Sequence, residues 1–306
     1  MTKVFIDGSA GTTGLRINER LAGWKDMELV KIPDHLRKDP NARRDAVCSA
    51  DVAFLCLPDD AAREVVALVG DADTKIIDTS TAHRVDPNWV YGFPEIGLRE
   101  KIASSKRIAN PGCHASGFIA LVAPLVQNGL LSPDTALTAF SLTGYSGGGK
   151  KMIAQYEDAQ ADVLLQGPRQ YGLSQVHKHL KEMVQLCSLE IAPVFCPIVG
   201  AFYSGMEVTV PVFAKDLKGC MADVRQLYRD YYHQGLVRFK DTDDGDGFLS
   251  AAAYSGRDDM EVTVFGNEER ILLTARFDNL GKGASGAAIQ NMNILLGLDE
   301  TTGLNV

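Results

Sequence analysis

The first 112 residues alternate short apolar strands with helical patterns, and this alternation restricts the fold more than any other feature of the sequence. Strands are expected at residues 3–7, 27–32, 52–57, 75–78 and 107–109, and a helix at about 60–69. Strands that alternate with helices in this way form a parallel sheet joined by crossover helices. The sequence therefore predicts a doubly wound α/β fold of the Rossmann type for this part of the chain.

A glycine-rich loop follows the first strand directly. Gly8, Gly11 and Gly14 are spaced G-x-x-G-x-x-G, and a helical pattern begins at once. Such glycines permit a tight turn and let the backbone approach a pyrophosphate, which then lies at the helix N-terminus. With Thr12 and Thr13 between them, these residues are candidates for binding a dinucleotide cofactor. The alternative is a plain strand-to-helix turn.

The residues after the second strand bear on the choice of nicotinamide cofactor. NAD sites usually place an acidic residue there for the ribose hydroxyls, whereas NADP sites favour a nearby arginine. Arg37 and Lys38 are suited to hold a 2′-phosphate, while Asp34 keeps NAD open. We therefore favour NADP, with Arg37 as the candidate contact and solvated surface charge as the alternative.

A single cysteine, Cys113, follows the turn Asn110-Pro111-Gly112 and precedes an apolar run. The run predicts a helix with the cysteine in its first turn. Unpaired backbone N–H groups and the positive end of the helix dipole favour the thiolate there. A thiolate at a helix start is a nucleophile when a base and a substrate pocket face it. The alternative is a buried cysteine that happens to follow a turn.

Two histidines are candidates for that base. His177 and His179 have period-two spacing, which puts both rings on one side if the segment is extended, and Glu182 follows three residues later. A histidine is the usual proton shuttle for a thiolate, and a carboxylate can orient it. A polar surface strand is one alternative. A zinc site with Cys113 is another, although no spaced ligand set supports it, and we expect no metal.

The second half of the chain has a different pattern. Strands are expected at residues 135–142, 207–214, 260–265 and 270–277, the last two joined as a hairpin, with a helix at about 219–234. This arrangement favours an α+β domain. The run from Gly144 to Lys151 combines glycines, hydroxyls and two lysines, which suits an anionic group, and a mobile loop is the alternative. Arg84, after the fourth strand, is either an anion contact or a surface ion pair.

Composition excludes several classes of partner. The 306 residues are enough for two domains, and a net charge of -8 argues against nucleic acid, whose phosphates call for a basic face. No apolar run is long enough to span a membrane, and the N-terminus enters a strand without room for a signal peptide. We therefore expect a cytoplasmic chain with its six cysteines reduced. The aspartates at 241–247 lack calcium-loop spacing and are expected to form a solvated acidic loop.

Taken together, these motifs resemble the N-acetyl-γ-glutamyl-phosphate reductase family of arginine biosynthesis, in its shorter form. The resemblance covers nearly the whole chain: the glycine loop at 8–14, Asn110-Pro111-Gly112-Cys113, the segment 144–147, His177-x-His179-x-x-Glu182 and the tail at 283–293. Aspartate-semialdehyde dehydrogenase is a sister family that shares the sheet, the cysteine and the chemistry. The spacing of the two histidines favours the first family.

The resemblance implies a fold and a division of the chain. It implies a Rossmann-type domain at 1–112, completed by a C-terminal helix at 281–306. It also implies a second, α+β catalytic domain at 113–280, of the glyceraldehyde-3-phosphate-dehydrogenase-like type. Because related enzymes assemble from identical chains, we expect a homo-oligomer, a dimer or a tetramer.

The resemblance also implies an acyl-phosphate reduction with NADP as cofactor. Cys113 would attack the acyl phosphate and form a thioester, which hydride from NADPH reduces to the semialdehyde. His177 would move protons, His179 or Glu182 would orient it, and which histidine is the shuttle stays open. The remaining implied residues are Arg84, Ser146 and Lys150 for the phosphate, and Gln290 and Asn291 for the nicotinamide. The alternatives are an aspartate-semialdehyde-type reductase and a non-catalytic NADP-binding sensor.

Overall fold

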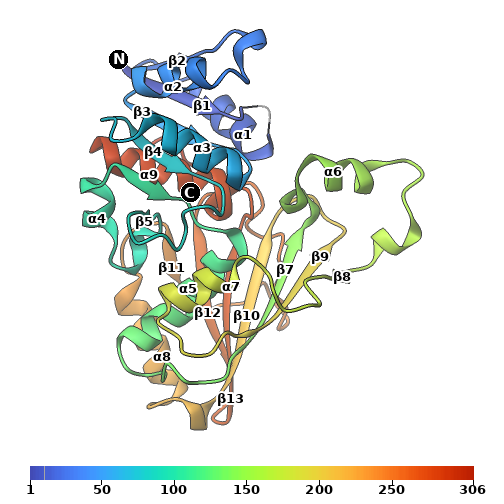
Figure 1. The fold of residues 1–306 in the computed structure, drawn as a ribbon. Coiled ribbons are helices and arrows are strands. Elements are labelled where there is room, and N and C mark those ends of the chain that lie inside the picture. The colour runs from blue at the N-terminus through green and yellow to red at the C-terminus, as the bar shows by residue number, and fades with distance from the viewer. Residues whose placement is uncertain (10) are drawn as a thin grey trace. The chain divides into compact units, whose positions relative to one another are not determined.

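The computed structural model describes residues 1–9 and 11–306, which form two compact units (Figure 1). The first unit consists of Met1–Pro111 and Ala284–Leu304. The second consists of Gly112–Gly283 and Asn305–Val306. Among the described residues, no helix combines the length and apolarity needed to cross a bilayer.

The first unit is built on a six-stranded parallel sheet in the order β2-β1-β3-β4-β6-β5. Its strands are β1 (Thr2–Asp7), β2 (Met27–Val30), β3 (Val52–Leu55), β4 (Lys75–Asp78), β5 (Val90–Tyr91) and β6 (Arg107–Ala109). All four residues of β3 are buried, as expected for a parallel sheet covered on both faces. The order places β1 inside the sheet with strands added on both sides, which confirms the predicted Rossmann-type fold.

Helices cover both faces of this sheet. They are α1 (Thr12–Leu21), α2 (Pro40–Ser49), α3 (Asp59–Val69), α4 (Arg99–Ser104) and α9 (Gly286–Leu296). Val52 and Phe54 point into a core shared with α1, α4 and α9, while Ala53 and Leu55 point into a core shared with α2 and α3. Alternate side chains of one strand therefore supply two separate cores. The C-terminal helix α9 is part of the first of them.

The second unit is built on a mixed seven-stranded sheet in the order β11-β12-β13-β10-β7-β9-β8. Its strands are β7 (Thr138–Gly144), β8 (Arg169–Gln170), β9 (Val194–Gly200), β10 (Met206–Phe213), β11 (Val237–Phe239), β12 (Met260–Gly266) and β13 (Arg270–Phe277). The predicted hairpin at the end of this sheet is confirmed, because β12 and β13 pair antiparallel. The strands β8, β9 and β11 have no counterpart in the sequence prediction.

Four helices belong to the second unit: α5 (Cys113–Gln127), α6 (Gly149–Glu157), α7 (Leu180–Leu186) and α8 (Met221–Tyr231). Helix α5 is buried along most of its length and packs against β10, β13, α7 and α8. Pro124 lies inside it and provides no N–H for the carbonyl of Ala120. The hydroxyl of Tyr232 donates to that carbonyl at 2.7 Å, so the buried carbonyl still has a hydrogen-bond donor.

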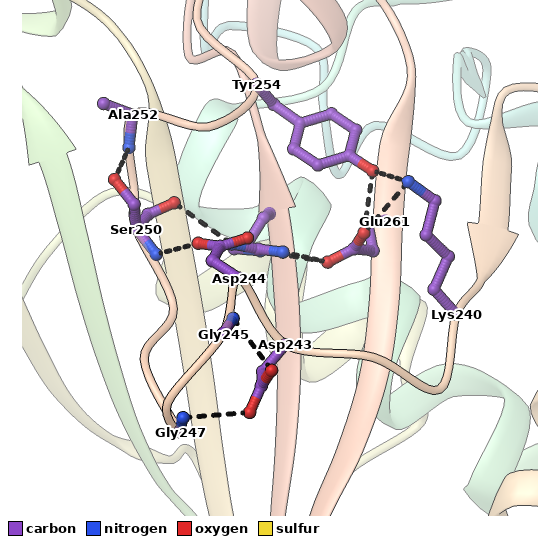
Figure 2. Close-up of polar contacts among 10 residues, drawn as sticks. Lys240, Asp243, Asp244, Gly245, Gly247, Ser250, Ala252, Tyr254 and Glu261 are labelled. Atoms are coloured by element: carbon purple, nitrogen blue, oxygen red, sulfur yellow. Dashed lines mark hydrogen bonds and ion pairs between the residues drawn. The ribbon is translucent and has the colours of Figure 1, made fainter.

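The face of this sheet that lies opposite α5 carries a buried network of charges. Arg276 on β13 lies in register between Glu207 on β10 and Glu261 on β12. Its guanidinium is 2.6 Å from the carboxylates of both Glu261 and Asp244. Figure 2 shows Lys240 and Tyr254 converging on Glu261, and the Tyr254 hydroxyl donates to it at 2.8 Å. The network fastens the loop between β11 and β12 onto the sheet.

Candidate active site

Cys113 is the first residue of α5, as predicted. Gly112 precedes it in extended conformation, and no side chain of the described residues caps this helix start. The cysteine is partly exposed, in contrast to the fully buried residues that follow. The backbone N–H groups of the first turn and the helix dipole therefore act on a sulfur that a substrate can reach. The arrangement favours a nucleophilic thiolate.

Gly283, in the short π-helical turn Gly281–Ser285, lies directly against the cysteine. A Cβ added at Gly283 would come within 2.9 Å of the Cβ of Cys113 and 3.1 Å of the carbonyl oxygen of Asp278. Both distances are shorter than van der Waals contact allows, so only glycine fits without displacing Cys113. The packing at Gly283 thus fixes the position of Cys113.

His177 and His179 lie in a turn and not in an extended strand. The N–H of Leu180 donates to the carbonyl of His177, and His179 is the N-cap of α7. The two rings nevertheless lie together, with centroids 4.7 Å apart and planes at 85°. The Nδ1 atom of His177 accepts the backbone N–H of His179 at 3.2 Å. Neutral His177 therefore carries its proton on Nε2.

Glu182 connects the histidines to the start of α5. It is buried, and its Oε2 accepts the backbone N–H of Gly112 at 3.0 Å. Its Oε1 lies 4.0 Å from Nε2 of His179. One carboxylate therefore holds the residue before Cys113 and also lies within ion-pair distance of the His179 ring. No group of three or more His, Cys, Asp or Glu side chains in the described part of the chain is arranged to hold a metal ion.

His114 belongs to this cluster and was not singled out from the sequence. It is buried, its Nδ1 lies 2.6 Å from Oγ of Ser141, and its Nε2 lies 2.6 Å from the hydroxyl of Tyr171. Burial, reinforced by the nearby charges of His177 and Lys178, lowers the pKa of His114 to about 3. The ring is therefore neutral at neutral pH. The available signal was its position, directly after Cys113 at the start of a buried apolar run.

Tyr171 is the second residue that sequence reasoning missed. Burial, with a smaller contribution from the charge of Cys113, raises the pKa of its phenol above the ordinary value. The hydroxyl therefore stays protonated and is close enough to feel the charge of the sulfur. Its ring centroid lies 6.0 Å from that of His177.

Ser146 and Lys150 lie where β7 leads into α6. Ser146 is buried, and its hydroxyl accepts a hydrogen bond from Nδ2 of Asn279 at 3.0 Å. Lys150 is exposed in the first turn of α6. Gly149 between them has φ +70°, a left-handed conformation that favours glycine. The hydrogen bond from Asn279 fixes the serine side chain, whereas the lysine cation lies at the surface.

Arg84 lies in the first unit, after the carboxyl end of β4. It is buried, and one Nη atom donates to the carbonyl of Thr79 at 3.1 Å. The preceding turn is rigid because the Asp78 carboxylate is 2.6 Å from Nδ1 of His83 and accepts the Ser80 hydroxyl at 2.7 Å. Arg84 is thus a preorganised cation at the sheet edge where ligands of such folds collect.

The glycine loop has the close backbone contacts that its sequence predicts. Gly8 has φ +84°, and a Cβ there would lie 2.2 Å from the carbonyl oxygen of Cys56. A Cβ on Gly14 would lie 2.5 Å from the carbonyl oxygen of Gly8. Gly11 is the N-cap of α1, and Thr12 and Thr13 are its first two residues. Ala10, within the same loop, lies outside the described residues.

A pocket of about 520 Å³ adjoins this loop within the first unit, and its lining includes Gly8, Lys31, Arg37, Lys38 and Arg43. Arg37 pairs with Asp34 at 2.8 Å on the surface. Arg43, which the sequence analysis missed, pairs with the largely buried Asp7 at 2.8 Å. The pocket thus gathers four cations beside the glycine loop.

Gln290 and Asn291 lie on α9 and are fully buried. The Gln290 amide donates to Glu95 at 2.9 Å and to Glu300 at 3.2 Å. The Asn291 amide donates to the carbonyl of Gly92 at 2.9 Å. The amide nitrogens of both residues therefore hold the first unit together, and their role toward a nicotinamide stays a prediction.

Two family models match the chain. The semialdehyde dehydrogenase dimerisation domain matches residues 113–279, and the semialdehyde dehydrogenase NAD binding domain matches residues 25–105. The second match supports a nicotinamide cofactor.

Similar proteins agree with these matches. The chain is 47% identical to N-acetyl-gamma-glutamyl-phosphate reductase 2 of Nostoc sp., with 99% of each chain covered. It is 46% identical to N-acetyl-gamma-glutamyl-phosphate reductase of Brucella ovis, with 96% of this chain and 99% of that one covered.

Solved structures with the same fold include aspartate semialdehyde dehydrogenase II of Vibrio cholerae complexed with ASA, at a TM-score of 0.72 and 15% identity over 97% of this chain and 98% of that one. Aspartate semialdehyde dehydrogenase of Candida albicans with NADP gives a TM-score of 0.67 and 16% identity, over 97% and 98% of the two chains. At such identities the likeness concerns the fold alone. The sequence identities with the reductases, together with the family models, show that the chain belongs to the semialdehyde dehydrogenase family, within its N-acetyl-γ-glutamyl-phosphate reductase branch.

Proposed function

We propose that this enzyme reduces N-acetyl-γ-glutamyl phosphate to N-acetylglutamate semialdehyde and phosphate, with NADPH, through a thioester on Cys113. The observation that carries the proposal is the helix start at Cys113, where an accessible sulfur shares one unit with His177, His179 and Glu182. The names of the similar reductases support the choice of substrate.

The covalent step begins with attack of the Cys113 thiolate on the γ-carbonyl carbon. The C–S bond forms, the bond from that carbon to the phosphate oxygen breaks, and phosphate leaves. A nicotinamide cofactor, held by the glycine loop and by Gln290 and Asn291, would supply the hydride for reduction of the thioester carbonyl. The resulting hemithioacetal releases the aldehyde when its C–S bond breaks and Cys113 regains the electron pair. The thioester divides one difficult reduction into two feasible steps.

His177 is proposed as the proton shuttle. Its Nδ1 accepts the backbone N–H of His179, so its Nε2 is the nitrogen that exchanges a proton with the sulfur or with the carbonyl oxygen. His179 and Glu182 would orient the segment, since the carboxylate lies 4.0 Å from the His179 ring and also holds Gly112.

Phosphate binding is proposed for Arg84, Ser146 and Lys150. Arg84 supports it as a buried guanidinium held by Thr79, and Lys150 as an exposed cation in the first turn of a helix. Ser146 would contribute through its hydroxyl proton, because its oxygen already accepts from Asn279. These groups carry the donors that a phosphate needs.

NADP is the proposed cofactor. The residues of the first unit fit a dinucleotide, because the glycine loop adjoins a basic pocket of about 520 Å³. Gly8, Gly11, Thr12, Thr13 and Gly14 would hold the pyrophosphate, Arg37 the 2′-phosphate, and Gln290 and Asn291 the nicotinamide. Arg43 is a second cation in reach of that pocket, although Asp7 engages it.

The proposed division of labour assigns cofactor binding to residues 1–112 with the C-terminal helix at 281–306, and catalysis to 113–280. A homo-oligomer, dimer or tetramer, is proposed with it, and the description of the matched dimerisation domain supports self-association. The cytoplasm is the proposed location.

The test is a reverse-direction assay with N-acetylglutamate semialdehyde, phosphate and NADP, followed by the absorbance of the reduced nicotinamide. We expect phosphate-dependent reduction of NADP and a lower kcat/KM with NAD. A preference for aspartate semialdehyde would assign the chain to the sister activity. Binding of NADP without phosphate-dependent turnover would identify a sensor and overturn the proposal.

A further inference from the structure

Arg43 differs from the other cations of the pocket beside the glycine loop, because the fold holds its side chain in place. Its Nε donates to a carboxylate oxygen of Asp7 at 2.9 Å, and its Nη2 lies 2.8 Å from the same oxygen. The Arg43 side chain is 11% exposed, whereas that of Arg37 is 58% exposed. Lys31 and Lys38 are also exposed. Among these four described cations of the lining, Arg43 is therefore the one with a fixed position.

The pair of Asp7 and Arg43 places the guanidinium beside the glycine loop. Asp7 is the last residue of β1 and directly precedes Gly8, while Arg43 belongs to the first turn of α2. The Nη1 atom of an arginine carries two further N–H groups. Within residues 1–9 and 11–306 no acceptor binds them, and Arg43 lines the pocket. The guanidinium therefore has donors left for a ligand in this pocket.

A fixed guanidinium suits a phosphate better than an exposed cation does. Its planar N–H groups match the oxygens of a phosphate and can donate two hydrogen bonds in parallel. An exposed arginine or lysine loses side-chain freedom when it binds, and solvent screens its charge. Arg43 has already lost that freedom on folding. We therefore expect Arg43 to contribute more to phosphate binding than Arg37 does.

The same pocket has an apolar part that suits the base of a dinucleotide. Its apolar lining includes Leu29, Ile32, Leu57 and Ala61. NADP and NAD share that base and the pyrophosphate, and they differ in the 2′-phosphate. Resting on the proposed use of NADP, we propose that Arg43 binds the 2′-phosphate and determines the preference for NADP over NAD. Arg37, the contact predicted from the sequence, adds a smaller and more general attraction.

A second effect of Arg43 must be separated from this contact. Without the guanidinium, the Asp7 carboxylate would repel the phosphates of NAD and NADP alike. Asp7→Asn combined with Arg43→Gln removes one negative and one positive charge, so the net charge of the pocket stays that of the parent chain. The double variant therefore loses the donor and leaves no unpaired carboxylate.

The experiment measures the dissociation constants of NADP and NAD by isothermal titration calorimetry, with the full-length chain and without substrate. We expect the double variant to bind NADP about 10- to 100-fold more weakly, as for the loss of a hydrogen bond between charged groups, and NAD within about twofold of the parent chain. Arg43→Gln alone should weaken NADP at least as much and should also weaken NAD, because Asp7 is then unpaired.

Arg37→Gln is the matched control, because it removes an arginine from the same pocket. The Arg37 side chain is exposed and pairs with Asp34, so the affinity for NADP should fall by less than about fivefold. If Arg43→Gln does not fold, the double variant carries the test, since it leaves no buried charge without a partner. The melting temperature of each variant verifies its fold.

A ratio of NADP to NAD affinity in the double variant equal to that of the parent chain would overturn the proposal, because Arg43 would then only neutralise Asp7. A larger loss in Arg37→Gln than in the double variant would overturn it too. A parent chain that binds NAD as tightly as NADP would refute the choice of cofactor, and the proposal with it. Binding needs no semialdehyde, so these results stand apart from the proposed substrate.

Discussion

The two faces of the seven-stranded sheet each bury a polar cluster, and the clusters are built on different principles. Ser141 and Ala275 face the side of α5, whereas Arg276, the next residue on β13, faces the opposite side. On the helix side, His114 is neutral and engaged by two hydroxyls. On the other side, Arg276 is charged and paired with two carboxylates.

The Arg276 network has a structural role, whereas the His114 cluster belongs to the candidate active site. A buried charge is tolerated only when an opposite charge lies beside it. In the Arg276 network, the buried guanidinium has such partners in Asp244 and Glu261. A neutral ring carries one N–H and one lone pair, so one of its two hydroxyl partners donates to it and the other accepts from it. The charged network fastens the loop between β11 and β12, whereas the neutral ring lies beside His177 and His179 of the candidate active site.

The largest expected effect is on turnover and belongs to the helix side. Cys113→Ser should lower kcat by at least about 10³-fold, because the hydroxyl is a far weaker nucleophile than the thiolate. The melting temperature and the affinity for NADP should stay near those of the parent chain. Near-normal turnover in this variant would show that the sulfur forms no thioester.

The largest expected effect on stability belongs to the opposite face. Arg276→Ala should lower the free energy of unfolding by about 3–5 kcal/mol, because it leaves Glu261 buried without its guanidinium. Denaturant unfolding measures the change, and Arg276→Lys is the milder comparison. The thiol pKa of Cys113 should not move in folded Arg276→Lys. A shift there would mean that the two faces are coupled.

Lowering the pH is expected to change the free energy of unfolding in opposite directions through the two faces. The pKa of His114 falls from its ordinary value of 6.5 to about 3 on folding, so the unfolded chain binds more protons between these values. Stability on the helix side is therefore lost as pH falls below 6.5, by about 2 kcal/mol at pH 5. On the other face, burial raises the pKa of Glu207 above its ordinary value of 4.5, so the folded chain binds more protons between these values and stability increases as pH falls through that range.

His114→Gln isolates this effect because glutamine does not titrate. Unfolding free energies of the variant and the parent chain should differ less at pH 5 than at pH 7, by about 2 kcal/mol. Asp244 provides the contrast: Arg276 lowers its pKa, so its contribution is lost only below the ordinary aspartate range. An equal difference at both pH values would mean that His114 is not buried as a neutral ring.

The smallest effect is expected at the edge of the charged network. Lys240 is half exposed and lies 3.2 Å from Glu261 (Figure 2). Lys240→Met should change the free energy of unfolding by less than about 1 kcal/mol, because solvent screens exposed pairs. A urea titration measures it. A loss as large as that of Arg276→Ala would show that the lysine holds the loop as strongly as the arginine does.

The sequence predicted those features whose determinants are local. The start of α5 at Cys113 follows from a Pro-Gly turn before an apolar run, and the β12–β13 hairpin follows from four turn residues between two strands. The family and the Rossmann-type sheet were predicted correctly because several such motifs recur in a fixed order.

Features that depend on distant residues were missed. His114 meets Tyr171 across 57 positions of the chain, and no spacing rule indicates that contact. The spacing of His177 and His179 left their conformation open, and the formation of α7 directly afterwards decides it. Asp244 was expected in a solvated loop, and its pairing with Arg276 depends on a strand 32 residues away.

The account depends most on covalent chemistry at Cys113, and the mass of the intact protein tests it directly. N-acetylglutamate semialdehyde and NADP are mixed with the enzyme without phosphate and quenched in acid. We predict one acyl group per chain, located on Cys113 and removed by hydroxylamine, with one equivalent of reduced nicotinamide formed. Reduced nicotinamide without any acyl group on the protein, or an acyl group on another residue, would contradict the account.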